Sequence, residues 1–110
     1  MSDKLLVIVS SGEKEKALTG LTFALRTLSE GWMEQVKVVI FGPAEKVLAA
    51  DTDLQQAAHQ IAQVEKPVAC RFIAERDGIA EKLTAAGLTV DYVGKMVNDL
   101  IKDGFTPLVF

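Results

Sequence analysis

The sequence predicts an α/β fold in which a parallel sheet is flanked by helices. Two apolar runs rich in β-branched residues, Leu5–Val9 and Val36–Phe41, are typical of strands buried on both faces. Between such runs lie stretches whose apolar residues recur every three or four positions, which is the spacing of an amphipathic helix. Because strands and helices alternate over short links, we expect neighbouring strands to run parallel.

The first helix is expected to follow the first strand directly. Ser10 is followed three residues later by Glu13, which is the pattern of a capping box at a helix start. Gly31 is expected to end the helix, because glycine tolerates the left-handed conformation found there. Its apolar stripe consists of Ala17, Leu18, Leu21, Ala24, Leu25 and Leu28.

Two further helices are expected after the second strand. The strand stops at Gly42-Pro43, and Pro43 suits the first turn of a short helix that includes Val47 and Leu48. The segment Asp51-Thr52-Asp53 then interrupts the chain and caps another helix. The buried side of that helix is expected to consist of Leu54, Ala57, Ala58 and Ile61.

The third strand begins at Pro67 and extends to Cys70, or further to Ile73. A helix over Gly78–Ala86 follows, with Ile79 and Leu83 facing inward, and Gly87 closes it. Leu88, Val90 and Tyr92-Val93 indicate a fourth strand.

A short amphipathic helix and a last strand complete the predicted fold. The helix carries Met96, Val97, Leu100 and Ile101 and ends at Gly104. Phe105–Phe110 is the final strand, and Pro107 restricts it to an edge of the sheet because proline cannot donate a ladder hydrogen bond.

Composition limits the range of functions. A length of 110 residues fits one domain spanning the whole chain, and 49% apolar with 25% charged residues is ordinary for a globular protein. The formal net charge of −3, with no Lys/Arg cluster, argues against nucleic-acid binding. The apolar run near the N-terminus is too short for a membrane span, and no signal-peptide cleavage pattern follows it. A single cysteine cannot form an internal disulfide, and a free thiol fits a reducing compartment, so we expect a cytoplasmic protein.

Two polar features have mainly structural interpretations. The Ser10-Ser11-Gly12 loop lies between a strand and a helix, where backbone N–H groups can hold an anion. It lacks both common nucleotide-binding glycine patterns, so an ordinary helix start is the favoured interpretation and a nucleotide site a weak one. His59, the only histidine, has glutamines around it and is expected to be solvated. A zinc site would need carboxylates to complete it, so we expect no metal and no cofactor.

Cys70 is the main candidate for chemistry, and its pattern leaves two interpretations open. A free cysteine often packs as a small apolar residue, and a strand continuing to Ile73 would favour that structural role. If the strand ends at Cys70, the thiol lies near the start of a helix beside Arg71, with Arg76 within reach. A helix N-terminus and a guanidinium both favour a nucleophilic thiolate. The solvent exposure of Cys70 is the observation that separates these interpretations.

The chain resembles the DsrE/DsrF-like (sulfur-relay, YchN-type) family over nearly its whole length. The resemblance is carried by Leu5–Val9, by Val36–Pro43, and by Pro67-Val68-Ala69-Cys70 with Asp77-Gly78-Ile79 after it. The closing segment, with Val93-Gly94, Leu100-Ile101 and Gly104-Phe105, is also similar. Each motif is short, and their order and spacing together are moderately specific.

The resemblance implies a three-layer α/β/α fold with a five-stranded, mainly parallel sheet. It also implies trimers or hexamers, and a strand that ends at or just after Cys70. Where the family's cysteine is active, it carries sulfur as a persulfide between partner proteins, and Cys70 matches its position. We therefore expect an intracellular, sulfurtransferase-like carrier with sulfur donor and acceptor proteins. Arg71 would favour the thiolate, and Ser10, Ser11 and Gly12 would line the same pocket. The alternative is a non-catalytic oligomeric binding or regulatory module in which Cys70 is structural.

Overall fold

The computed structural model describes residues 3–110 and contains a five-stranded, all-parallel sheet, as the sequence predicts. The order of the strands across the sheet is β4-β3-β2-β1-β5. The strands are β1 (Lys4–Val9), β2 (Gln35–Ile40), β3 (Val68–Cys70), β4 (Thr89–Asp91) and β5 (Thr106–Val109). The helices are α1 (Lys14–Glu30), α2 (Pro43–Ala50), α3 (Thr52–Ala62), α4 (Arg71–Arg76), α5 (Ala80–Ala85) and α6 (Gly94–Lys102).

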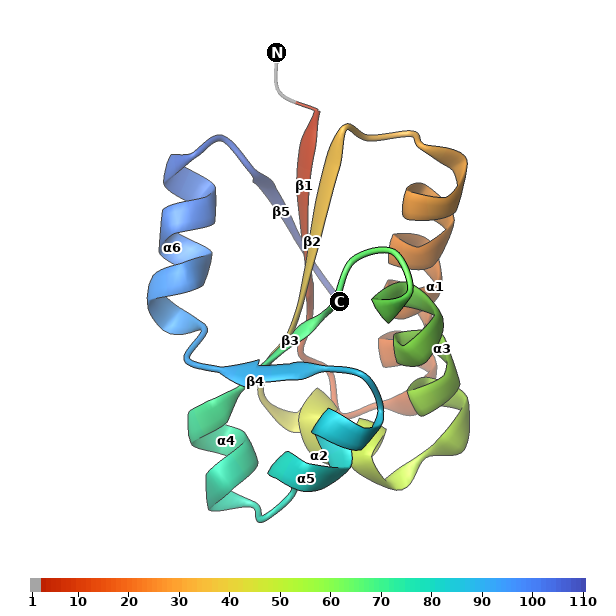
Figure 1. The fold of residues 1–110 in the computed structure, drawn as a ribbon, viewed down its shortest axis with the longest axis vertical. Helices are drawn as coiled ribbons and strands as arrows, with labels where there is room; N and C mark the ends of the chain where they lie inside the picture. The colour runs from red at the N-terminus through yellow and green to blue at the C-terminus, as the bar shows by residue number, and fades with distance from the viewer. Residues whose placement is uncertain (1–2) are drawn as a thin grey trace.

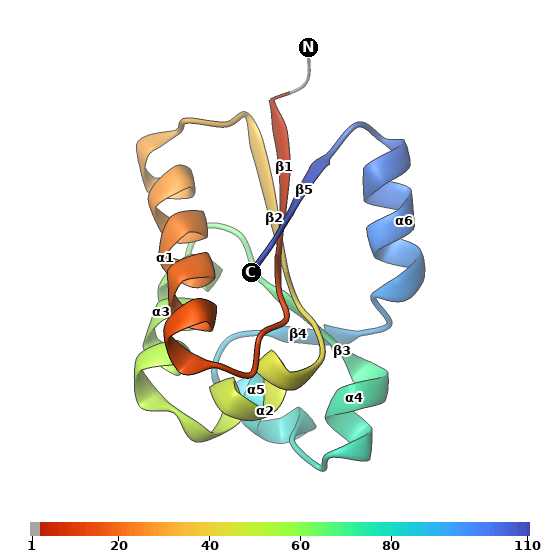
Figure 2. The same ribbon diagram turned by 180° about the vertical axis from the view of Figure 1, so that it is seen from behind.

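Helices cover both faces of the sheet, which gives the expected three layers (Figure 1). The chain steps from β1 to β4 through adjacent strands, so right-handed crossovers carry the intervening helices past one face. From β4 the chain returns to the other side of β1, and this reversal carries α6 past the opposite face (Figure 2). The helices α1 and α3 lie along one face, whereas α2, α4 and α5 gather at the carboxyl ends of the strands (Figures 1 and 2).

The two faces of the sheet bury cores of different size. Alternation along a strand sends neighbouring side chains to opposite faces, so Val7 joins the core under α1 and α3 while Leu6 faces α6. The cluster on the α6 side is the smaller of the two. Its buried members are Leu6, Val39, Cys70, Val93 and Phe105.

The predicted capping box at the start of α1 is wrong. The residue that caps this helix is Glu13, it makes no side-chain capping hydrogen bond, and α1 begins at Lys14. Ser11, not Ser10, accepts the N–H of Glu13, through its hydroxyl oxygen at 3.0 Å. The Ser10 N–H instead donates to the carbonyl oxygen of Phe110 at 2.8 Å, which extends the sheet contact beyond the last strand.

The other predicted boundaries agree with the structure more closely. Pro43 opens α2, and Asp51 caps α3 by accepting the N–H of Leu54 at 3.0 Å. Gly31 ends α1 with a φ of 66°. The strand β5 lies at an edge, as Pro107 predicts.

The region after Cys70 contains a helix that the sequence pattern did not predict. The strand β3 ends at Cys70, and α4 begins at the next residue. The predicted helix over Gly78–Ala86 is shorter, because α5 starts only at Ala80. Within residues 3–110, no helix is long and apolar enough to cross a bilayer.

Candidate functional site

The carboxyl ends of β1, β2 and β3 bring Ser10, Gly42 and Cys70 to one end of the sheet. These three residues each follow or end a neighbouring strand. The Ser10 carbonyl accepts the N–H of Ala44 at 3.1 Å, which fixes the start of α2 against the loop after β1. In open parallel sheets this end of the strands is where ligands and catalytic groups gather.

Cys70 is the last residue of β3 and directly precedes α4. Only 7% of its surface is exposed, and its side chain packs in the smaller core with Val39 and Val93. The thiol makes no capping hydrogen bond to α4. The end of β3 at Cys70 is the boundary that the reactive interpretation of this thiol requires. The burial of the Cys70 side chain is what the structural interpretation predicts.

A buried carboxyl group lies beside Cys70. Glu45, in the first turn of α2, has none of its surface exposed. Its Oε2 atom accepts the main-chain N–H of Gly42 at 3.3 Å, and the main chain of Cys70 lies nearby. Among the residues that the structure describes, Oε1 has no hydrogen-bond partner.

Burial determines the protonation of Glu45. Removal from water disfavours the carboxylate and raises its pKa from 4.5 to about 7, although the N–H group of Gly42 acts in the opposite direction. Asp77 also raises this pKa, and Arg76 lowers it. A carboxyl group with a pKa near neutrality can take up or release a proton under physiological conditions, which is a common property of groups in functional sites.

A shallow depression of about 410 Å³ lies between α2 and the end of α4. Its charged lining residues are Lys46, Arg76 and Asp77, and the Nε atom of Arg76 pairs with Oδ1 of Asp77 at 3.1 Å. Gly42 lines the same depression, so this surface adjoins the main-chain group that binds Glu45.

The guanidinium group of Arg71 contacts the end of β4. Its Nη2 atom donates to the carbonyl oxygen of Val90 at 3.0 Å, and the guanidinium carbon lies 5.4 Å from the centre of the Tyr92 ring. These contacts tie the first residue of α4 to the end of β4. The observed role of Arg71 is therefore to fix α4 against the neighbouring strand.

The Ser10-Ser11-Gly12 loop lines a different depression, of about 540 Å³, together with Pro43, Val109 and Phe110. Cys70 is not among its lining residues. The N–H groups of Ser10 and Ser11 both donate to the carbonyl oxygen of Phe110, at 2.8 and 3.1 Å. Two of the N–H groups that an anion would use are thus occupied by the main chain.

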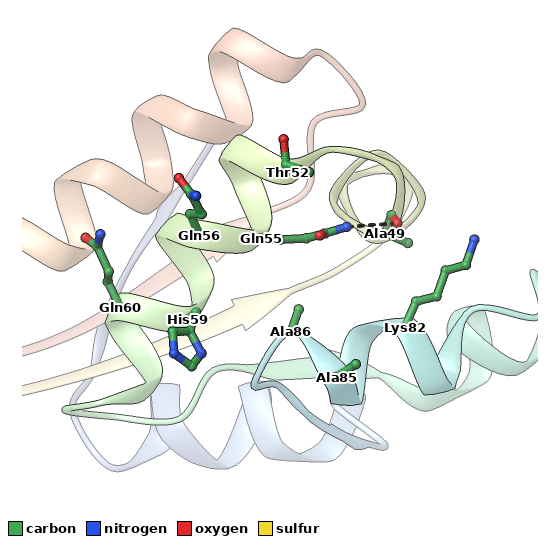
Figure 3. A pocket seen from close by; sticks show the side chains of 9 residues that line it. All are labelled: Ala49, Thr52, Gln55, Gln56, His59, Gln60, Lys82, Ala85 and Ala86. Carbon is green, nitrogen blue, oxygen red and sulfur yellow. Dashed lines mark hydrogen bonds between the residues drawn. The ribbon is translucent and has the colours of Figure 1, made fainter.

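His59 is exposed, as expected, and lines an open depression of about 760 Å³ between α3 and α5 (Figure 3). Gln55 extends from α3 toward α2 and donates to the carbonyl oxygen of Ala49 at 3.0 Å, while Lys82 approaches from α5 (Figure 3). Within residues 3–110, no three His, Cys, Asp or Glu side chains form a group that could hold a metal ion.

Glu45 is the site residue that the sequence analysis missed. The signal was present, because a glutamate three residues after Gly42 occupies the position from which a side chain reaches back to a helix start. That pattern is ordinarily a solvent-exposed cap. No neighbouring residue in the sequence distinguishes such an exposed cap from a glutamate that the tertiary fold buries.

Comparison with known proteins identifies the fold and leaves the function open. No protein-family model and no curated protein matches the chain. A conserved protein of unknown function from Bacteroides thetaiotaomicron is similar in structure, with a TM-score of 0.90, 26% sequence identity, and coverage of 98% of this chain and 95% of its own. A protein of unknown function from Methanobacterium thermoautotrophicum has a TM-score of 0.74 and 15% identity over 97% of this chain and 98% of its own.

Proposed function

We propose that this chain belongs to the DsrE/DsrF-like family and carries sulfane sulfur as a persulfide on Cys70, for delivery to a partner protein in the cytoplasm. The observation that carries the proposal is the position of Cys70, at the carboxyl end of β3 and beside the ionisable carboxyl group of Glu45. The sequence resemblance to that family supports the same chemistry. Cys70 is the only cysteine, so the reaction has to proceed with one thiol.

The sulfur-transfer step conserves atoms and electrons and needs no oxidant. The Cys70 thiolate attacks the outer sulfur of a donor persulfide, R–S–SH, so an S–S bond forms at Cys70 as the S–S bond of the donor breaks. The donor leaves as the thiol R–SH, which carries the proton that Cys70 released. The same exchange, with an acceptor thiolate attacking the outer sulfur on Cys70, delivers the sulfur and regenerates the thiol.

Exposed aromatic side chains next to Cys70 support a protein as the exchange partner. Phe72 is 64% exposed and Tyr92 is 60% exposed, and both lie within two residues of the Cys70–Asp91 pair in the sheet register. Exposed aromatic residues are enriched at protein interfaces, where they supply most of the binding energy. We expect Phe72→Ser to slow sulfur delivery to a protein acceptor and to leave loading by polysulfide unchanged.

Mass spectrometry after incubation with polysulfide tests the proposal. We expect an adduct of one sulfur atom on Cys70 that a reducing agent removes and that Cys70→Ser abolishes. A small reference thiol in the same reaction serves as the control for reagent quality. If the reference thiol is modified and Cys70 remains unmodified, the sulfur-carrier function is wrong.

The burial of Cys70 favours a second candidate function, a non-catalytic binding or regulatory module with a structural cysteine. A thiol that is 7% exposed and packed beside Leu6 and Phe105 resembles a core residue. This candidate predicts that Cys70 reacts with alkylating reagents much more slowly than a free thiol. It also predicts that Cys70→Ser leaves partner binding intact.

Self-association is part of the proposal. The edge strand β5 has four exposed residues, and two of them, Leu108 and Val109, are large and apolar. An unpaired strand edge with apolar side chains is a surface to which another chain can add. We propose that copies of the chain associate through this edge, in the trimers or hexamers that the family resemblance implies.

A further inference from the structure

The depression between α3 and α5 is lined mainly by uncharged polar side chains (Figure 3). Its volume of about 760 Å³ is in the range of small-molecule sites. Most of the lining comes from one face of α3, because the residues concerned recur at three- and four-residue spacing along that helix. They are Thr52, Gln55, Gln56, His59 and Gln60.

No acidic side chain belongs to the described lining of this depression. The exposed face of a helix ordinarily carries charged residues, and the chain has 15 acidic residues from which such a face could be built. The one formally charged lining residue is Lys82, on α5. The depression therefore carries a local positive charge on a protein whose formal net charge is −3. A positive charge in a hollow of the surface favours an anionic ligand.

The carboxylates nearest to this lining in the sequence are engaged elsewhere. Asp51 and Asp53 flank Thr52, at the start of α3. The Nζ atom of Lys14, on α1, lies 2.9 Å from a carboxylate oxygen of each. Among the described residues, no carboxylate pairs with Lys82. The ammonium group of Lys82 is thus available to a ligand.

The glutamine side chains of α3 favour a ligand that has hydroxyl groups. Like a hydroxyl group, a glutamine amide both donates and accepts hydrogen bonds. The Nε2 atom of Gln55 donates to the carbonyl oxygens of Leu48 and Ala49, both at 3.0 Å, so both of its N–H groups are used and its own carbonyl oxygen is left to accept. The exposed side-chain amides of Gln56 and Gln60 have no hydrogen-bond partner within residues 3–110.

We propose that the depression between α3 and α5 binds a small anion that carries hydroxyl groups, with Lys82 on the anionic group and the glutamine amides of α3 on the hydroxyl groups. A phosphate ester and a carboxylate both suit Lys82, because an ammonium group binds either one as a point charge. The small side chains of Ala49, Ala85 and Ala86 leave space for the ligand. Cys70 packs in the core beneath α6 and is not a lining residue, so the proposal is independent of sulfur carriage.

An NMR titration of the full chain tests the proposal. Two matched probes are glucose phosphorylated on its primary hydroxyl group, and glucuronate, which has a carboxylate in that place. We expect either probe to shift the amide signals of Gln55, Lys82 and Ala86 saturably, with a Kd of about 1 mM. Binding of either probe supports the proposal, and the tighter of the two identifies the anionic group. Absence of saturable shifts at these residues with both probes overturns it.

Glucose and inorganic phosphate separate the two halves of the ligand. Each is expected to bind at least about fivefold more weakly than the phosphorylated sugar, because each lacks one set of contacts. If inorganic phosphate binds as tightly as the phosphorylated sugar, the hydroxyl groups are not recognised and the proposal is wrong. Gln56→Ala is expected to weaken binding of the phosphorylated sugar and to leave binding of inorganic phosphate unchanged.

Lys82→Gln removes the charge at an exposed position and should leave the fold intact. We expect it to weaken binding of the phosphorylated sugar about fivefold. The matched control is Lys102→Gln, an exposed lysine in the last turn of α6, on the other face of the sheet (Figure 2). Equal affinities of the two variants would overturn the role of Lys82. A protein that binds the sugar and fails to accept sulfur on Cys70 would refute the sulfur-carrier function and leave this site standing.

Discussion

A Cβ atom on Gly20 would lie 2.8 Å from the Cβ atom of Phe110. Gly20 is in the middle of α1, and Phe110 follows β5, so the missing side chain allows the last residue of the sequence to pack beneath the first helix. The ring of Phe110 also lies 5.7 Å from that of Phe23. The same segment carries the carbonyl oxygen that binds the Ser10 and Ser11 N–H groups.

Gly20→Ala is expected to destabilise the protein by about 1–3 kcal/mol, because the added methyl group meets Phe110 in a packed core. Alanine ordinarily stabilises a helix interior relative to glycine by about 1 kcal/mol. A loss of stability in Gly20→Ala would therefore reflect the close packing and not helix propensity. Urea unfolding measures it. Gly94→Ala in α6 is the control, because nothing lies within 4 Å of the position that its Cβ would take. A neutral or stabilising Gly20→Ala would contradict the close packing.

The free energy of unfolding should decrease as the pH rises from about 4.5 to about 7, through the contribution of Glu45. Burial raises the pKa of Glu45 in the folded protein, so in this range the folded state binds more protons than the unfolded state. The stability that this proton supplies is complete below pH 4.5 and is lost as the pH passes 7. At about 1.4 kcal/mol per unit, the loss is at most about 3.5 kcal/mol.

Chemical unfolding of wild type and Glu45→Gln at several pH values measures this contribution. The variant is expected to lack the Glu45 component of the slope, while its stability at any one pH also reflects the buried amide that it introduces. The two proteins are therefore compared by how steeply the free energy of unfolding changes with pH. Parallel curves for the two proteins would show that Glu45 does not titrate in this range.

Lys14 links the starts of two helices, and the link should be sensitive to acid. Its Nζ atom lies 2.9 Å from carboxylate oxygens of both Asp51 and Asp53, and Asp51 also caps α3. In the folded protein, Lys14 lowers the pKa of Asp51 below its ordinary value of 3.8. The stability that this carboxylate contributes is therefore complete above pH 3.8 and is lost as the pH falls through the pKa of Asp51 in the folded state.

Substitution of Asp51 separates the cap from the charge. Asp51→Asn keeps an oxygen that can accept the N–H of Leu54 but removes the ion pair, and Asp51→Ala removes both. We expect the alanine variant to be the less stable of the two, and the asparagine variant to lose part of the acid sensitivity. Equal stability of the two variants in thermal unfolding would show that the cap contributes nothing.

Val109→Lys should disrupt association if copies of the chain meet at β5. Val109 is 68% exposed on the edge strand, so a lysine there is tolerated by the monomer, whereas a charge on a strand edge opposes pairing with another chain. Sedimentation velocity at micromolar concentration measures the state. We expect an oligomer for the wild type and a monomer for the variant, and the proposal is wrong if the wild type is already a monomer.

The fold could be predicted from the sequence because its signals are local. Pro43, Asp51 and Gly31 mark helix ends by properties of their own backbone and side chains, and the structure confirms each of them. The helix α4 was missed because Phe72 and Ile73 extend the apolar run of β3. In the structure Phe72 faces solvent, a property that the apolar pattern alone does not show.

The candidate site was only half predictable for a different reason. Cys70 could be singled out because it is the only cysteine and because one of the two predicted ends of the third strand falls on it. The burial of Glu45 depends on the tertiary fold, which brings α4 against α2 although the two helices are more than twenty residues apart in the chain. Likewise, the loop at Ser10 and Ser11 loses two free N–H groups to Phe110, at the other end of the sequence.

The place of β5 beside β1 has a consequence for the order in which the chain can fold. During synthesis β1 emerges first and can pair with β2, but its other edge has no partner until Thr106–Val109 has left the ribosome. Until then, a strand that becomes interior to the sheet is an open edge. An apolar strand in that state is prone to pair with other nascent chains, so the interval before β5 pairs with β1 is when chaperones would protect this protein.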